Sequence, residues 1–188
     1  MYRDLILPTA AAAPNVPGLA PLRRAMAAVW EALGSVPDPE VPAVSVVELG
    51  LIRQVEWREE ELIVHLTTTY SGCPAADMIR TLIHEQLAAL GVAHVTLVTQ
   101  LAPAWSTDWI APEARSKLRA YGIAPPHLTA ERIDVAGISP LRHGTLRVPC
   151  PLCGSSRTSL LSQFGSTACK AQYRCDACLE PFDYFKPH

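Results

Sequence analysis

The chain has 188 residues, 49% of them apolar and 18% charged, with a formal net charge of −2 at pH 7. This much apolar material can form a buried core, which excludes a wholly disordered chain. The nearly balanced charge gives no reason to expect a polyanion-binding protein, although residues 141–188 are modestly basic, with 6 basic and 3 acidic side chains.

The first twenty residues are rich in alanine and proline. Their apolar stretch is short, Pro8 interrupts it, and the acidic Asp4 stands where a signal peptide would carry basic residues. No apolar run in the chain approaches the ~18 residues that a membrane-spanning helix requires. We therefore predict a flexible lead over residues 1–20, a cytoplasmic protein and no membrane partner.

Residues 21–123 predict a compact α+β domain in which helices cover a small sheet, with the element order α-β-β-α-β-α. Apolar residues recur at helical spacing in some segments and alternate in others, and Gly and Pro punctuate the boundaries. The expected elements are a helix over 21–33, strands over 51–58 and 62–69, a helix from Pro74 to Gly91, a strand over 92–101 and a short helix from about Pro112.

The segment between the first helix and the first strand, SVPDPEVPAVSVVELG, contains three prolines. Proline fixes its own backbone and restricts the residue before it, so this segment cannot form a regular helix. It should instead be a stiff loop that presents Asp38 and Glu40. Isolated acids on such a loop are usually only solvated.

Cys73 lies between Gly72 and Pro74, where a predicted strand gives way to a predicted helix. The N–H groups of a first helical turn and the helix dipole favour a thiolate, so we expect its pKa to lie below the usual ~8.5. Gly72 would allow a partner or an ion to approach closely. A passive N-cap role fits equally well, and neither His65 nor His84 has an evident reason to act as a base toward Cys73.

The chain changes character after residue 123. Residues 124–145 combine proline and glycine with little periodicity, which predicts a linker. Residues 146–188 contain five of the six cysteines, several aromatic residues and short strand-like runs. This composition predicts a small C-terminal β ribbon.

Four cysteines form two C-x-x-C pairs, Cys150 with Cys153 and Cys175 with Cys178. Two such turns on facing hairpins can complete a tetrahedral shell of four sulfurs, which suits zinc. The segment has little apolar core, and a structural metal ion supplies on the order of 10–16 kcal/mol of folding free energy to such units. Cys169 is a fifth thiol that we interpret as a small buried apolar residue rather than a ligand.

Other chemistry remains open for these cysteines. Iron or an iron–sulfur cluster can use the same four thiolates. A thioredoxin-like dithiol would precede a helix in a βαβ unit, which the surrounding sequence does not favour. The electrostatics do not favour a nucleic-acid-binding zinc ribbon either, because the excess of basic residues is small.

Four motifs in order, DPEVP, ELGL, TTTYSGCP and WSTDW, resemble the iron–sulfur assembly family that includes SufT-type proteins, over about residues 22–123. Glu48 stands where that family usually has Asp, and Cys73 matches the family's reactive cysteine. The residues that the resemblance marks as functional are Asp38, Glu40, Glu48, Gly50, Leu51, Thr69, Gly72, Cys73 and Pro74.

With the four-cysteine tail ending in EPFDYFKPH, the chain is similar to accessory proteins of a phenylacetyl-CoA epoxidase system. The resemblance implies a non-catalytic factor that helps to mature the metal centres of a di-iron oxygenase or an iron–sulfur reductase. Transient iron at Cys73, flanked by Asp38 and Glu40, and contacts with iron–sulfur assembly machinery or a second copy of the chain fit this role. The alternatives are a redox-active iron–sulfur subunit of the oxygenase complex and a zinc ribbon that binds protein or nucleic acid.

Overall fold

The computed structural model describes residues 20–70, 72–127 and 148–187. Nearly all of the predicted lead over 1–20 and most of the predicted linker over 124–145 lie outside the described residues. By its internal contacts the chain divides into two compact units, one of Met1–Thr68 with Pro74–Pro103 and one of Thr69–Cys73 with Ala104–His188. Helices and small sheets together confirm the predicted α+β class.

The first unit contains two helices and a three-stranded sheet. Strands β1 and β2 form the predicted antiparallel hairpin, and β3 adds in parallel to β2, so the strand order is β1-β2-β3. The predicted order of elements is confirmed, although the strands are shorter than expected. Their bounds are α1 (Ala20–Gly34), β1 (Ile52–Arg58), β2 (Glu61–Leu66), α2 (Ala76–Ala89) and β3 (Val95–Thr99).

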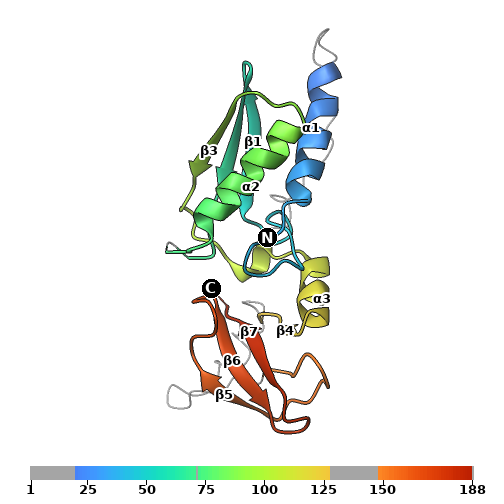
Figure 1. Ribbon diagram of the computed structural model, residues 1–188, viewed down its shortest axis with the longest axis vertical. Helices are drawn as coiled ribbons and strands as arrows, with labels where there is room; N and C mark the ends of the chain where they lie inside the picture. Colours follow the sequence, from blue (N-terminus) through green and yellow to red (C-terminus); the bar gives the residue numbers. More distant parts are fainter. Residues whose placement is uncertain (1–19, 71, 128–147, 188) are drawn as a thin grey trace. The chain divides into compact units, whose positions relative to one another are not determined.

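One face of this sheet is packed against helix α2, which lies across the strands with α1 beside it (Figure 1). Arg80 of α2 donates hydrogen bonds to the carbonyl oxygen of Leu97 and to the hydroxyl of Thr99, both on β3. The fully buried side chains of α2 and β2 include Ile79, Ile83, Leu87, Leu62, Val64 and Leu66. Among the described helices, none combines the length and the apolar character needed to cross a membrane.

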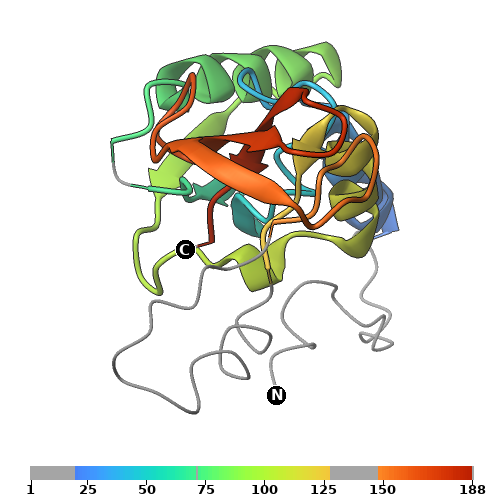
Figure 2. The same cartoon turned by 90° about the horizontal axis from the view of Figure 1, so that it is seen from below.

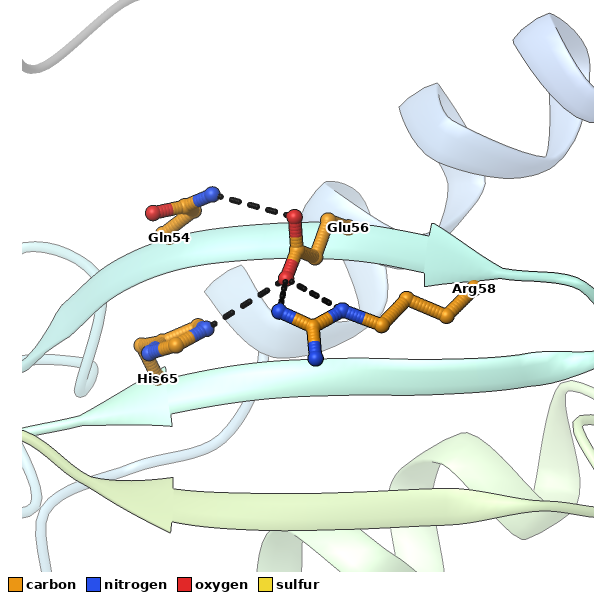
Figure 3. A network of polar contacts seen from close by, with 4 residues as sticks. All are labelled: Gln54, Glu56, Arg58 and His65. Atoms are coloured by element: carbon orange, nitrogen blue, oxygen red, sulfur yellow. Dashed lines mark hydrogen bonds and ion pairs between the residues drawn. The ribbon is translucent and has the colours of Figure 1, made fainter.

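A polar network lies on β1 and β2 (Figure 3). The Glu56 carboxylate accepts hydrogen bonds from Arg58 Nε at 3.0 Å and Nη2 at 2.6 Å, and from Gln54 Nε2 at 3.3 Å. His65 Nε2 lies 3.7 Å from Glu56 Oε1. The imidazole of His65 is therefore part of a local cross-strand network, with a carboxylate neighbour of its own.

The second unit contains a four-stranded sheet with the order β4-β7-β6-β5. Strands β5, β6 and β7 form an antiparallel meander, whose strands Figure 2 shows side by side. The helix predicted from Pro112 is confirmed. The elements are η1 (Thr107–Trp109), α3 (Pro112–Ala120), β4 (Ile123–Ala124), β5 (Thr158–Ser162), β6 (Lys170–Cys175) and β7 (Pro181–Phe185).

Strand β4 pairs in parallel with β7, with Ile123 opposite Asp183 and Ala124 opposite Tyr184. Helix α3 contacts β4 directly. By contacts, therefore, α3 and β4 group with the ribbon, whereas the motifs place α3 in the domain over 21–123. The proposed division into domains over 21–123 and 146–188 remains a prediction.

The ribbon has a small core in which cysteines take a large part. Tyr173 stacks on Phe182, with ring centroids 5.9 Å apart, and meets Tyr184 edge to face at 5.6 Å. The buried residues of this cluster are Ala124, Val148, Cys150, Ala171, Cys175, Phe182 and Tyr184. Because few of these side chains are large and apolar, apolar burial alone gives this sheet limited stabilisation.

Candidate functional site

The four predicted ligands meet at one point of the ribbon. The Sγ atoms of Cys150, Cys153, Cys175 and Cys178 all lie within 4.8 Å of one another. The closest pairs join the two turns, with Cys150 and Cys178 at 3.8 Å and Cys153 and Cys175 at 3.5 Å. A tetrahedral shell with Zn–S bonds of about 2.3 Å has sulfur–sulfur edges of about 3.8 Å. The donor set and its spacing therefore fit a bound metal ion.

The two cysteine turns share one backbone design. The N–H of the residue four positions after the first cysteine donates to that cysteine's carbonyl oxygen, from Gly154 to Cys150 at 2.9 Å and from Leu179 to Cys175 at 2.9 Å. Both donors have positive φ, +74° at Gly154 and +68° at Leu179. This conformation suits glycine and is strained for leucine. Each turn thus directs two sulfurs toward one position.

The second turn supplies backbone donors to its sulfurs. The N–H groups of Ala177 and Cys178 donate to Cys175 Sγ at 3.4 and 3.5 Å. These bonds, that from Cys178 first, overcome desolvation and lower the pKa of Cys175 to about 6. The Glu180 N–H lowers the pKa of Cys178, but desolvation and the three neighbouring sulfurs raise it to about 12. Crowded sulfurs resist carrying several negative charges together, and a cation at their centre relieves this repulsion.

Cys169 lies outside the four-sulfur group. Its side chain is buried, with 4% exposed, and its sulfur lies 3.0 Å from the hydroxyl of Thr167. Its carbonyl oxygen accepts a hydrogen bond from the Lys186 N–H. The burial agrees with its interpretation as a packed residue.

The DPEVP motif forms a compact loop organised by Asp38. Its carboxylate oxygen Oδ1 accepts hydrogen bonds from the N–H groups of Glu40 and Val41, both at 2.9 Å. Only 8% of Asp38 is exposed, so it is not the solvated acid that such a loop would usually carry. Asp38 therefore holds the loop in shape, which presents the half-buried Glu40 from a fixed backbone.

Glu48 and Ser45 form a reciprocal pair that was not expected from the sequence. The Ser45 N–H donates to Glu48 Oε2 at 2.9 Å, and the Glu48 N–H donates to Ser45 Oγ at 3.2 Å. This is the geometry of a capping box, in which Ser and Glu three residues apart satisfy each other's backbone donors. The S-x-x-E spacing was the available signal. It gives Glu48 a structural task in the turn that leads to Gly50.

The TTTYSGCP motif lies between β2 and α2. Thr69 and Cys73 are half-buried and Gly72 is exposed. The N-cap of α2 is Ala75, without a side-chain cap. The prediction that Pro74 takes the first helical position is therefore wrong by two residues. The helix begins later because Pro74 and Ala75 form a turn, so Cys73 is not the N-cap.

The predicted site residues fall into three groups. The four cysteine ligands of the ribbon come together. Asp38, Glu40 and Glu48 belong to one loop of the first unit, and Thr69, Gly72 and Cys73 belong to a segment that groups by contacts with the second. The prediction that Asp38 and Glu40 flank Cys73 spans the two units and remains a prediction.

Two family models match separate parts of the chain. Residues 26–100 match the iron–sulfur cluster assembly protein family, and residues 137–186 match the PaaD zinc beta ribbon domain. A curated Escherichia coli (strain K12) protein, described as a putative 1,2-phenylacetyl-CoA epoxidase component of the PaaD type, is 48% identical over 158 residues. The match covers 84% of this chain and 90% of that protein.

Solved structures resemble about half of the chain. A domain of unknown function (DUF59) from Bacillus anthracis is 27% identical and has a TM-score of 0.46, with 49% of this chain and 89% of that one covered. A conserved hypothetical protein from Thermotoga maritima is 32% identical, with a TM-score of 0.42 and coverages of 48% and 89%. A Mycobacterium tuberculosis protein associated with Fe–S complex assembly and repair is 29% identical, with a TM-score of 0.32 and coverages of 61% and 94%.

Proposed function

Because the chain belongs to the PaaD family of 1,2-phenylacetyl-CoA epoxidase components, we propose that it is an accessory maturation subunit of the epoxidase system in phenylacetate catabolism. It assists the assembly of metal or iron–sulfur centres in the oxygenase or the reductase and does not itself catalyse the oxygenation. The observation that carries the proposal is the union, in one chain, of an iron–sulfur assembly match with a PaaD zinc ribbon match.

The two parts divide the work. The ribbon binds one structural zinc ion through Cys150, Cys153, Cys175 and Cys178, and it serves as the docking module for client subunits. Zinc suits a four-thiolate shell of this spacing because it has no redox chemistry and accepts tetrahedral geometry without strain. The metal fixes the shape of the ribbon, and the clients recognise that shape.

Cys73 is the working thiol of the assembly motif. A thiolate that is half-buried can bind iron transiently and still release it to a client, because it does not by itself provide a complete coordination shell. Asp38 holds its loop through two backbone bonds, and Glu40 extends from that loop as a candidate oxygen ligand.

The decisive experiment co-produces the oxygenase and reductase with the Cys73→Ser chain. We expect about a tenfold or greater loss of epoxidase activity and of client iron, since one atom is changed at the position that would hold the metal. The zinc content and circular dichroism of the variant should match those of the natural chain. Full activity with normal client iron would contradict the proposal.

Cys169→Ser is the matched control, because it makes the same chemical change at a cysteine outside both the motif and the four-sulfur group. It should leave client iron unchanged. A comparable loss in both variants would indicate a general sensitivity to thiol removal rather than a role for Cys73.

Metal analysis of the purified chain tests the ribbon. One equivalent of zinc in a colourless sample supports a structural site. Iron with visible absorbance, in protein purified without oxygen, would instead identify a redox-active subunit, since the same four sulfurs can hold iron.

A further inference from the structure

The four sulfurs of the metal centre differ in their access to solvent. Cys150 and Cys175 are 2% and 0% exposed and belong to the core cluster of the ribbon, and Cys178 packs against that cluster. Cys153 is exposed and does not take part in it. A Cβ atom placed on Gly154, the next residue, would meet no atom within 4 Å. Reagents in solution can therefore approach the centre from the side of Cys153.

The sulfurs also differ in how strongly backbone donors hold their electrons. Cys175 Sγ accepts two N–H bonds, from Ala177 and Cys178. Within the described residues, no backbone N–H donates to Cys153 Sγ, whose one polar contact there is Cys175 Sγ at 3.5 Å. A hydrogen bond to a thiolate stabilises its charge and lowers its nucleophilicity. Cys153 is thus the ligand that is both exposed and without such a donor.

We propose that Cys153 is the modification site of the metal centre, the ligand that electrophiles and hydrogen peroxide attack first, and that Cys175 resolves the oxidised sulfur as a disulfide. This inference rests on the proposed zinc thiolate site and deepens it. Cys175 is the natural resolving partner because its sulfur is closer to Cys153 than that of Cys178 is to Cys150. Oxidation would therefore join the two turns to each other.

The chemistry balances with hydrogen peroxide as the oxidant. The Cys153 thiolate attacks one peroxide oxygen, the O–O bond breaks, and hydroxide leaves to become water, which gives a sulfenic acid. The Cys175 thiolate then attacks that sulfur, the S–O bond breaks, and a second hydroxide leaves. Two thiolates lose two electrons in total, and one peroxide becomes two waters. The centre is left with two of its four ligands, too few to retain the ion.

The first test uses the zinc-loaded full chain and one equivalent of N-ethylmaleimide. Peptide mapping should find Cys153 modified at least about fivefold more often than any other ligand, because exposure and thiolate character set reactivity. A chromogenic chelator in solution should detect zinc released in step with that modification. Equal modification of the four ligands, or preference for Cys150, Cys175 or Cys178, would overturn the proposal.

The second test uses hydrogen peroxide and a matched pair of variants, Cys153→His and Cys178→His. Each keeps a four-ligand zinc site of three cysteines and one histidine. We expect zinc release to slow by about tenfold in Cys153→His and to change by less than about twofold in Cys178→His, since only the first removes the reactive thiolate. Mapping of the oxidised natural chain should find the Cys153–Cys175 disulfide. The opposite order of rates, or a Cys150–Cys178 disulfide instead, would overturn the inference.

These outcomes separate the two proposals. A purified chain without zinc would contradict the proposed structural site before any reagent is added. A chain that holds zinc but reacts elsewhere would leave that site intact and remove the role of Cys153. Cys73, which lies outside the metal centre, is followed separately in the same maps and does not decide the result.

Discussion

The first unit and the ribbon are stabilised by different forces. In the first unit the fully buried side chains are large and aliphatic, such as Leu62 on β2 and Ile83 on α2. In the ribbon, two residues of the buried cluster, Cys150 and Cys175, are also metal ligands. One part can therefore fold by apolar burial, whereas the other depends on an ion to complete its core.

This difference bears on function because it assigns the shape of each part to a separate variable. The conformation of the first unit depends on its packing, and the conformation of the ribbon depends on the metal supply and the thiol state. A maturation factor built in this way could present its docking ribbon only when the ribbon is metallated. Each prediction below perturbs one part and asks whether the other part responds.

Removal of the metal should have the largest effect. Chelation of zinc should destabilise the ribbon by on the order of 10 kcal/mol, because its small core cannot replace the binding free energy of the ion. Hydrogen exchange read by mass spectrometry should show loss of protection in β6 and β7. Strands β1 and β2 should keep theirs. Unchanged protection in β6 after complete chelation would show that the ribbon folds without a metal.

A cavity in the first unit should have the next largest effect and the opposite distribution. Leu62→Ala removes a fully buried side chain, and such changes cost about 2–5 kcal/mol. Urea denaturation should record this loss, while the zinc content stays at one equivalent. Leu160→Ala is the control, because Leu160 is 48% exposed on β5 and its truncation should cost less than about 0.5 kcal/mol. Loss of zinc from Leu62→Ala would show that the two parts are coupled.

Glu48→Ala should have a moderate effect confined to the first unit. It removes the acceptor of the Ser45 N–H, and capping interactions of this kind contribute about 0.5–2 kcal/mol. Glu48→Gln retains an acceptor oxygen and should cost less than Glu48→Ala in the same denaturation experiment. If both variants are as stable as the natural chain but fail to mature the clients, Glu48 acts in function rather than in folding.

The sequence predicted the parts of the molecule that local rules determine. The C-x-x-C spacing was sufficient to identify Cys150, Cys153, Cys175 and Cys178, because two short turns can direct four sulfurs to one point. Periodicity was sufficient to place α2 and the β1–β2 hairpin, to within a few residues at their ends. The S-x-x-E pair of Ser45 and Glu48 was equally readable, but the proline-rich context directed attention to loop acids instead.

The parts that the sequence did not predict depend on distant pairing. Strand β4 consists of only Ile123 and Ala124, which is too short for any periodicity, and its partner β7 begins at Pro181. No local pattern indicates a pair separated by so much chain. The start of α2 was missed for a different reason, because Pro74 is suited to the first helical turn and equally suited to the turn that precedes it.

A final pair of variants compares the two cysteine turns at their one geometric mismatch. Gly154 and Leu179 occupy the same place in the two turns, both with positive φ. A left-handed conformation costs an L-residue roughly 1–2 kcal/mol, whereas the added chain entropy of glycine costs roughly 0.5–1 kcal/mol. The Leu179 side chain is 70% exposed, so its removal sacrifices little burial.

Leu179→Gly should therefore stabilise the metallated ribbon by about 0.5–1 kcal/mol, and Gly154→Ala should destabilise it by about 1 kcal/mol. Because folding and metal binding are linked in the ribbon, zinc affinity should rise by up to about fivefold in the first variant and fall by a similar factor in the second. Competition with a chelator of known affinity measures both changes. An added Cβ at Gly154 meets open space, so a loss there would reflect backbone strain alone. Equal affinities in the two variants would show that strain in the turns does not reach the metal, whereas opposite shifts would show that the backbone conformation helps to set the ribbon's hold on its ion.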